Sequence, residues 1–385
     1  MHRLVVLLLL ASACGPCGGV SSPDAAGVSA LPRCLPPAAS PLAARSLDAL
    51  EARALEAEDD GDGALMLACA EEALRLDERH GHAAHLRAAA LVLLERWAEA
   101  QEAYAVALAL EPDDPFVLAG AAELYVSLLP WARSRSIAGV ALAERGLAAA
   151  AGQEGAGTPL LFRLHLLAAW GLGDLGDFRG ALAHARAAVA LRPDDRDAQV
   201  ELGRAHFELT RFQEAAVVLQ SWTAQAPDDA EAFHLLGLSL ERIPGAEALA
   251  DEALAIATRL DPEGFPPPVP VDERWVEEAI AALPQPERRL LERARVPVRL
   301  EALPALEDLR AEDPPLSPTA VGMFRGPPLG FDAPGPREIL LFTRNLSRSS
   351  RDAAGVREQV RITLLHELGH LAGESDADLR ARGLE

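Results

Sequence analysis

Hydrophobic positions recur through much of the chain at a fixed offset. The segment Ala73–Asp77 (ALRLD) returns 34 residues later as Ala107–Glu111 (ALALE). Pro193 and Pro227 are also 34 residues apart, and an Asp-Asp pair follows each. Repeats of this length are typical of helical hairpins that bury their apolar stripes against one another. The pattern therefore predicts a mainly α array over residues 43–262.

The landmarks within these units resemble those of the tetratricopeptide repeat (TPR). Leu-Gly pairs occur at residues 202–203 and 236–237, and Ala181 and Ala215 keep the same offset of 34. In that family the Gly and the later Ala lie where two helices approach most closely, and Pro ends the second helix. The resemblance implies an α-solenoid whose concave surface binds a protein or peptide. We expect units near residues 44–78, 79–112, 113–155, 160–193, 194–227 and 228–262.

Three of these units depart from the pattern, and the last of them, residues 228–262, is one residue longer than the offset. The first lacks a clear opening helix, and the third carries an insertion around residues 129–135. Tyr104 and Tyr125 are expected to fill the space between neighbouring hairpins.

The repeat pattern stops at Pro262, and residues 263–270 form a Pro-rich linker (EGFPPPVP) with few amide donors. Beyond it, the apolar spacing predicts a small α+β domain over residues 271–385. Its expected elements are helices over residues 272–283, up to 293 and 352–371, and strands over residues 295–300, 319–325 and 338–343.

Candidate chemistry lies near the end of this domain. His366 and His370 are four residues apart on the last long helix, so both imidazoles can reach one metal ion. Gly373 can end the helix and let the chain double back, which brings the carboxylate of Asp376 to the same ion. Glu367 lies beside these ligands as a candidate general base. The pattern indicates metal-assisted amide hydrolysis with Zn²⁺.

The string His-Glu-x-x-His-x-x-Gly-x-x-Asp resembles that of the Asp-zincins, and residues 272–379 resemble the minimal zincin-like metallopeptidases. The resemblance implies a zinc endopeptidase in which a strand at residues 322–326 or 337–342 borders the cleft and holds an extended peptide. No tyrosine lies in this domain to stabilise an oxyanion, which leaves Arg325 or Arg380 for that role.

A non-catalytic TPR scaffold with a structural or vestigial zinc site is the alternative to a peptidase. It predicts a protein that holds zinc but is inert towards peptides, with partners bound through the repeats alone.

The amino terminus has the pattern of an export signal. A positive start at residues 1–3 precedes seven apolar residues, and small residues lead to Cys14. The stretch LASAC resembles a bacterial lipobox, which implies removal of residues 1–13 and a lipid anchor on Cys14. Residues 14–42 then form a flexible tether. We expect a protein anchored in the bacterial envelope, at the outer membrane by resemblance; a periplasmic or secreted protein is the alternative.

Charge and cysteine content limit the partners and the covalent structure. A formal net charge of -22 argues against nucleic acid as a partner, because phosphate binding needs a dense positive footprint. Cys17 and Cys34 lie in the expected tether and either pair or remain free thiols. Cys69 is expected to be a small core residue, so no disulfide is predicted to hold the repeats.

Overall fold

The computed structural model describes residue 34 and residues 46–151, 157–311, 313–330 and 335–384. The chain divides into two compact units, residues 1–201 and residues 202–385. Among the described residues, no helix has the length and apolar character needed to cross a membrane.

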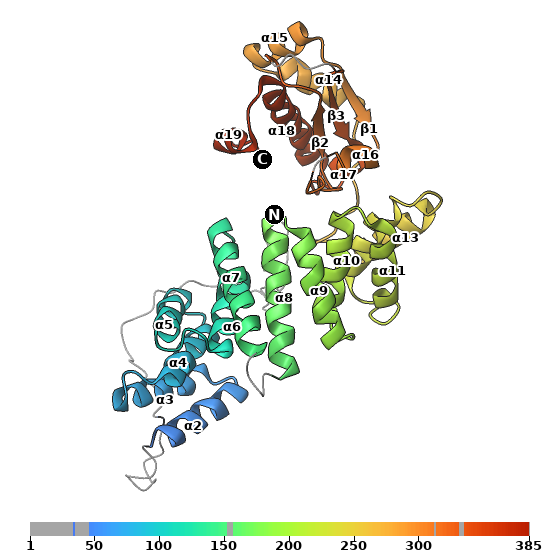
Figure 1. Cartoon of the computed structure of the whole chain (residues 1–385). Helices are drawn as coiled ribbons and strands as arrows, with labels where there is room; N and C mark the ends of the chain where they lie inside the picture. The colour runs from blue at the N-terminus through green and yellow to red at the C-terminus, as the bar shows by residue number, and fades with distance from the viewer. Residues whose placement is uncertain (1–33, 35–45, 152–156, 312, 331–334, 385) are drawn as a thin grey trace, which may run out of the picture. The chain divides into compact units, whose positions relative to one another are not determined.

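Helical hairpins follow one another along the expected repeats (Figure 1). Each expected unit contains two antiparallel helices, and short turns join them. The first four hairpins lie within residues 1–201. They pair α2 (Leu47–Asp59) with α3 (Gly63–Leu76), α4 (Gly81–Leu93) with α5 (Trp97–Leu110), α6 (Pro115–Glu123) with α7 (Arg133–Ala151), and α8 (Thr158–Leu175) with α9 (Phe178–Leu191). The later hairpins are α10 (Arg196–Glu208) with α11 (Phe212–Thr223), and α12 (Ala230–Leu240) with α13 (Glu247–Leu260).

Small residues let neighbouring helices approach closely. A Cβ atom on Gly120 of α6 would lie 2.3 Å from the hydroxyl oxygen of Tyr104 on α5. Tyr104 is buried between these hairpins, as the sequence predicts. Added bulk at such positions forces the helices apart, and this explains why Gly and Ala recur at the repeat offset.

Two details of the repeats differ from expectation. The first hairpin does have an opening helix: Ser46 caps the start of α2 and its side chain accepts from the amide of Ala49, and the helix buries Leu50. The sequence hid it because most of its positions are charged or Ala. In the third hairpin, a π-helical segment η2 (Leu124–Leu128) extends α6 just before the expected insertion. π-Segments accommodate extra residues in this way.

A disulfide joins Cys34 to Cys69, and the sulfurs lie in the core of the first repeats. The expectation that Cys69 is only a small core residue was therefore wrong, and Cys34 has Cys69 as its partner rather than Cys17. Cys69 lies on α3, and the bridge closes a segment of 35 residues. The sequence could not reveal the pair because nothing in the local pattern places residue 34 beside α3.

The C-terminal domain has the predicted α+β composition. Helices α14 (Glu273–Ala282) and α15 (Gln285–Ala294) precede a three-stranded sheet of order β1-β3-β2. β1 (Val298–Glu301) runs parallel to β3 (Glu338–Phe342), and β2 (Gly322–Arg325) runs antiparallel to it. The remaining elements are the short helices α16 (Leu306–Leu309) and α17 (Thr343–Leu346), the long helix α18 (Ala353–Ala372), and α19 (Asp376–Ala381).

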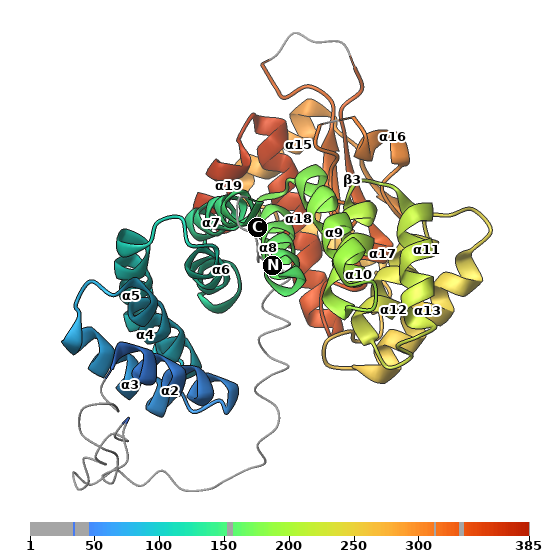
Figure 2. The same ribbon diagram turned by 60° about the horizontal axis from the view of Figure 1, so that its bottom comes forward.

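Helix α18 packs against β2 and β3 on one face of this sheet, with β2 as the edge strand beside it (Figure 1), and α18 and β3 are seen again in the turned view of Figure 2. Ile339 and Leu341 of β3 point towards α18 and share a core with Leu364 and Leu368. Residues alternate between the two faces of a strand, so Leu340 and Phe342 face the other side. The sheet thus provides a firm base for α18, which carries the predicted metal ligands.

The last hairpins belong to the same compact unit as the C-terminal domain. The guanidinium group of Arg242, at the end of α12, donates to the carbonyl oxygens of Pro304 and Pro318. Arg348 donates two hydrogen bonds to Glu241 at 2.9 and 2.6 Å. Side-chain contacts therefore join the last hairpins to the C-terminal domain directly, in addition to the linker at residues 263–270. The domain boundary expected at this linker stays a prediction.

Candidate metal centre

Two histidine side chains on α18 point towards a common position. The Nε2 atoms of His366 and His370 are 3.0 Å apart, and an Oδ1 atom of Asp376 lies 3.8 and 3.3 Å from them. Gly373 ends the helix with a φ of 91°, and the chain then turns back so that Asp376 begins α19. The structure therefore brings together the three residues that the sequence predicts as ligands.

The donor set fits a tetrahedral zinc ion. Ligand atoms that bind one zinc at ~2.0 to 2.1 Å in tetrahedral geometry are separated by roughly 3.3 Å. The three separations here, from 3.0 to 3.8 Å, bracket that value. Among the described residues, these three form the one group of at least three His, Cys, Asp or Glu side chains with this spacing. Three protein ligands leave a fourth position for water or substrate.

Backbone carbonyl oxygens hold both imidazoles in the orientation that metal binding requires. The Nδ1 atom of His366 lies 2.7 Å from the carbonyl oxygen of Leu384, and that of His370 lies 3.1 Å from the carbonyl oxygen of Glu374. A carbonyl oxygen only accepts, so each Nδ1 carries the proton and each Nε2 keeps its lone pair for a cation. These two contacts could not be predicted from the sequence, because every residue has a backbone carbonyl whatever its type.

The Glu367 side chain is buried between α18 and the edge strand β2. An added Cβ on Gly322 would lie 3.3 Å from its Oε1 atom, so a glycine keeps the strand close to the carboxylate. Burial raises the pKa of Glu367 to about 8; a backbone hydrogen bond from Phe324 lowers it, and the charge of Asp376 raises it. Such a poised carboxyl beside metal ligands is suited to general acid–base work.

Gly369 inside the histidine motif has a structural role that the sequence analysis missed. A Cβ atom there would lie 2.3 Å from Cδ2 of Leu379 on α19. The absence of a side chain lets α19 pack against α18, and this contact holds Asp376 near the histidines. Gly369, one of the variable positions between His366 and His370, therefore helps to keep the Asp376 carboxylate near the two histidines.

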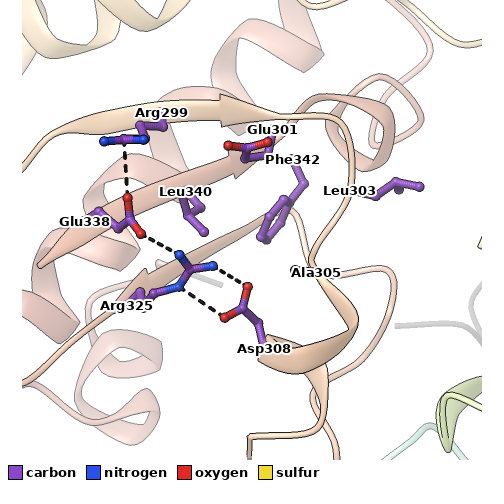
Figure 3. Close-up of a pocket in the computed structure, with 9 residues that line it drawn as sticks. All are labelled: Arg299, Glu301, Leu303, Ala305, Asp308, Arg325, Glu338, Leu340 and Phe342. Carbon is purple, nitrogen blue, oxygen red and sulfur yellow. Dashed lines mark hydrogen bonds and ion pairs between the residues drawn. The ribbon is translucent and has the colours of Figure 1, made fainter. Parts of the chain in front are cut away.

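Arg325 does not point towards the metal ligands. Its guanidinium group lies between Asp308 and Glu338, and its Nε atom is 3.1 Å from an Asp308 oxygen (Figure 3). These groups line a pocket with Leu340 and Phe342 on the sheet face opposite α18. Arg325 is therefore excluded as the local oxyanion donor in this arrangement. Arg380, the other candidate oxyanion donor, lies on α19.

Cys14, the predicted lipidation site, lies outside the described residues, and its acylation stays a prediction.

Two parts of the chain match known protein families. Residues 293–384 match the family model of a zincin-like metallopeptidase. The C-terminal part is a zincin-like domain. Residues 174–238 match a tetratricopeptide repeat model, so the chain contains both a TPR region and a zincin-like domain, as the sequence predicts.

Solved structures similar to this chain are TPR proteins. YrrB, a TPR protein described as having an unusual peptide-binding site, is 22% identical over 50% of this chain and 93% of its own, with a TM-score of 0.42. PilW, a type IV pilus biogenesis factor, is 21% identical over 57% of this chain and 96% of its own, with a TM-score of 0.47. For pilF of Pseudomonas aeruginosa these values are 15%, 56%, 92% and 0.46. No curated protein matches the chain.

Proposed function

We propose that this chain is an envelope-associated, zinc-dependent metallopeptidase whose repeats recruit protein substrates. The observation that carries the proposal is the convergence of His366, His370 and Asp376 on one position, with the Glu367 carboxyl buried beside it. A structural zinc site uses four protein ligands as a rule, whereas three ligands beside a general base are typical of hydrolytic sites.

The residues of this chain divide the work of amide hydrolysis. When bound, zinc supplies Lewis-acid activation of water and of the peptide carbonyl. Glu367 takes a proton at its carboxylate from the attacking water and passes it to the leaving amine. Its burial between α18 and β2 keeps bulk water from competing for that proton.

A substrate in extended conformation suits the edge of the sheet. Within the described residues, β2 pairs with β3 on one side only. An edge strand presents backbone groups that a peptide can pair with. Gly322 and Phe324 lie next to Glu367, so a peptide added along β2 would pass the catalytic carboxyl. We therefore propose unfolded or extended polypeptide segments as substrates.

The test combines metal analysis with one substitution in the purified full chain. We expect about one zinc per wild-type molecule and none in His366→Ala. Glu367→Gln keeps the zinc but loses peptide cleavage by ~10²- to 10⁴-fold, because a general acid–base residue contributes on that order. Glu358→Gln is the matched control: Glu358 lies on the same helix and pairs with Arg361 at the surface, so cleavage is retained. Equal cleavage by wild type and Glu367→Gln rejects the mechanism.

A non-catalytic scaffold is the second candidate, and one observation favours it. The guanidinium group of Arg325 is engaged by Asp308 and Glu338 on the opposite sheet face, and the domain contains no tyrosine. Arg380 on α19 is then the remaining candidate donor, and a site in which it does not reach the oxyanion would hold zinc without efficient hydrolysis. Zinc-loaded wild-type protein that cleaves no member of a broad peptide library would support this candidate.

The proposed location is the bacterial envelope, with a lipid on Cys14. The Cys34–Cys69 bridge supports export, because disulfides persist in oxidising compartments and are rare in the cytosol. Intact-mass analysis of protein purified from membranes tests the anchor. We expect the mass of an acylated chain that begins at Cys14, and a Cys14→Ser protein that leaves the membrane fraction. A wild-type chain that is soluble and unmodified after signal removal would instead indicate simple secretion.

A further inference from the structure

The residues after α19 fold back onto the histidine motif. Gly383 adopts a φ of 72°, which turns the chain at the end of the helix. The amide of Leu384 then donates to the carbonyl oxygen of Leu379 at 3.0 Å. The Leu384 side chain is buried in the same core as Leu371. This return brings the Leu384 carbonyl oxygen to Nδ1 of His366, at 2.7 Å.

A single guanidinium group ties this return to two other segments. Arg382 donates from Nη1 to an oxygen of Glu374 at 2.5 Å and from Nη2 to an oxygen of Glu287 at 3.2 Å. Glu374 follows the C-terminus of α18, and its carbonyl oxygen accepts from Nδ1 of His370. Glu287 lies on α15, outside the motif. Arg382 is thus two residues from one histidine-binding carbonyl and in contact with the residue that supplies the other.

We propose that Arg382 is a positioning residue that orients both zinc-binding histidines. This inference rests on the zinc site proposed above. Through Glu374 and the short return to Leu384, the guanidinium holds the two carbonyl acceptors in place, and through Glu287 it fixes them to α15. The side chain itself touches neither histidine and takes no part in the reaction.

The expected effect is on metal affinity more than on folding. Exposed ion pairs contribute little to stability, and the Arg382 side chain is 39% exposed. Groups that orient metal ligands, however, typically change metal affinity by 10- to 100-fold when they are removed. Because Arg382 acts one step further out than the carbonyl oxygens, we expect the lower end, about tenfold.

The test measures the zinc dissociation constant of the full chain by competition with a chromophoric chelator, together with the visible spectrum of the Co²⁺-substituted protein. Arg382→Gln is expected to weaken zinc binding about tenfold and to change the Co²⁺ spectrum, with little change in the thermal midpoint of the metal-free protein. Arg361→Gln is the matched control: it also removes one guanidinium paired with a glutamate, Glu358 on α18, and should leave affinity within about twofold of wild type.

Glu287→Gln provides a second variant that leaves the arginine in place and should weaken zinc binding in the same direction by a smaller factor. If Arg382→Gln proves unstable without metal, the result with Glu287→Gln decides. The inference is overturned if a folded Arg382→Gln protein binds zinc within twofold of wild type. Where Glu287→Gln decides, the same result for that variant overturns it. Either result leaves the peptidase proposal standing. A wild-type chain that binds no zinc overturns the proposed function itself.

Discussion

Contacts between neighbouring hairpins and contacts between the last hairpins and the zincin-like domain differ in their main chemistry. Hairpins meet mainly through small and apolar groups, with a few ion pairs beside them: a Cβ on Gly146 would lie 2.6 Å from Leu164, and one on Gly171 would lie 2.6 Å from Val140. The zincin-like domain is instead joined to the hairpins by guanidinium groups that donate to carboxylates, carbonyl oxygens and the Thr210 hydroxyl. These groups belong to Arg242, Arg310, Arg344 and Arg348. We call the second set the arginine joint.

This difference explains which contact the sequence could predict. Close approach at every hairpin demands the same small residues at the same offset, so it leaves a periodic signature. The arginine joint occurs once, and its partners are separated by 62 to 107 residues. Charged residues at such positions are indistinguishable in a sequence from ordinary solvated ones.

The largest expected effect comes from breaking the arginine joint at Glu241. Its side chain is 2% exposed and lies between Arg348, at 2.6 Å, and Arg344, at 3.4 Å. Removal of one partner from a buried ion pair leaves uncompensated charge and costs ~3 to 5 kcal/mol. We expect Glu241→Ala to lower the unfolding free energy of residues 202–385 by about 3 kcal/mol, near the lower end because Arg344 is partly exposed.

Chemical denaturation checks this, with Glu252→Ala on the exposed surface of α13 as the control. The control should stay within about 0.5 kcal/mol of wild type. Equal stability of the two variants would show that the joint is held by apolar contacts, like the hairpins.

The next effect concerns the first hairpins, where the sequence analysis missed the Cys34–Cys69 bridge. A disulfide that closes a segment of this length stabilises a fold by ~3 kcal/mol, mainly by restricting the unfolded chain. Cys69→Ala, or reduction of the wild type, should lower the stability of the first repeats by about this amount. Cys17→Ala should leave it unchanged. A wild-type unfolding curve that does not respond to reductant would contradict the bridge.

An acid-dependent effect is expected at His85, also in the first hairpins. Burial is the main cause that lowers the pKa of His85 to about 4. The unfolded chain, with a histidine pKa near ~6.5, then binds more protons than the folded one between pH 6.5 and 4, so stability falls as the pH falls through that window. We expect a loss of about 2 kcal/mol for wild type that is absent in His85→Leu. Parallel pH profiles for the two proteins would contradict a buried neutral histidine.

Features that depend on the type of residue at a given spacing could be predicted from the sequence, whereas features that depend on backbone atoms could not. The expected helix over residues 352–371 matches α18 within one residue at each end, and the ligand set His366, His370 and Asp376 converges as predicted. The spacing of the two histidines and the glycine after them predicts that geometry. The backbone carbonyl oxygens that orient the imidazoles could not be predicted from residue types. The opening helix α2 was hidden because only a few of its positions are buried.

The smallest effect compares one glycine from each architecture. Gly203 on α10 and Gly369 on α18 are both approached by a leucine: an added Cβ would lie 2.6 Å from Cγ of Leu219 in the first case and 2.3 Å from Cδ2 of Leu379 in the second. Alanine improves helix propensity by ~1 kcal/mol, whereas the crowding costs ~1 to 3 kcal/mol, so each substitution should destabilise its region by about 1 kcal/mol.

The consequences of the two substitutions should nevertheless differ in kind. Gly203→Ala moves one hairpin helix and should change stability alone, with zinc affinity unaffected. Gly369→Ala pushes Leu379 and α19 away from α18, and Asp376 moves with that helix. Zinc binding should therefore weaken severalfold in Gly369→Ala only, as measured by chelator competition on both proteins. Equal zinc affinity in the two variants would mean that α19 tolerates the shift without moving its ligand, and that the glycine in the motif serves packing just as the repeat glycines do.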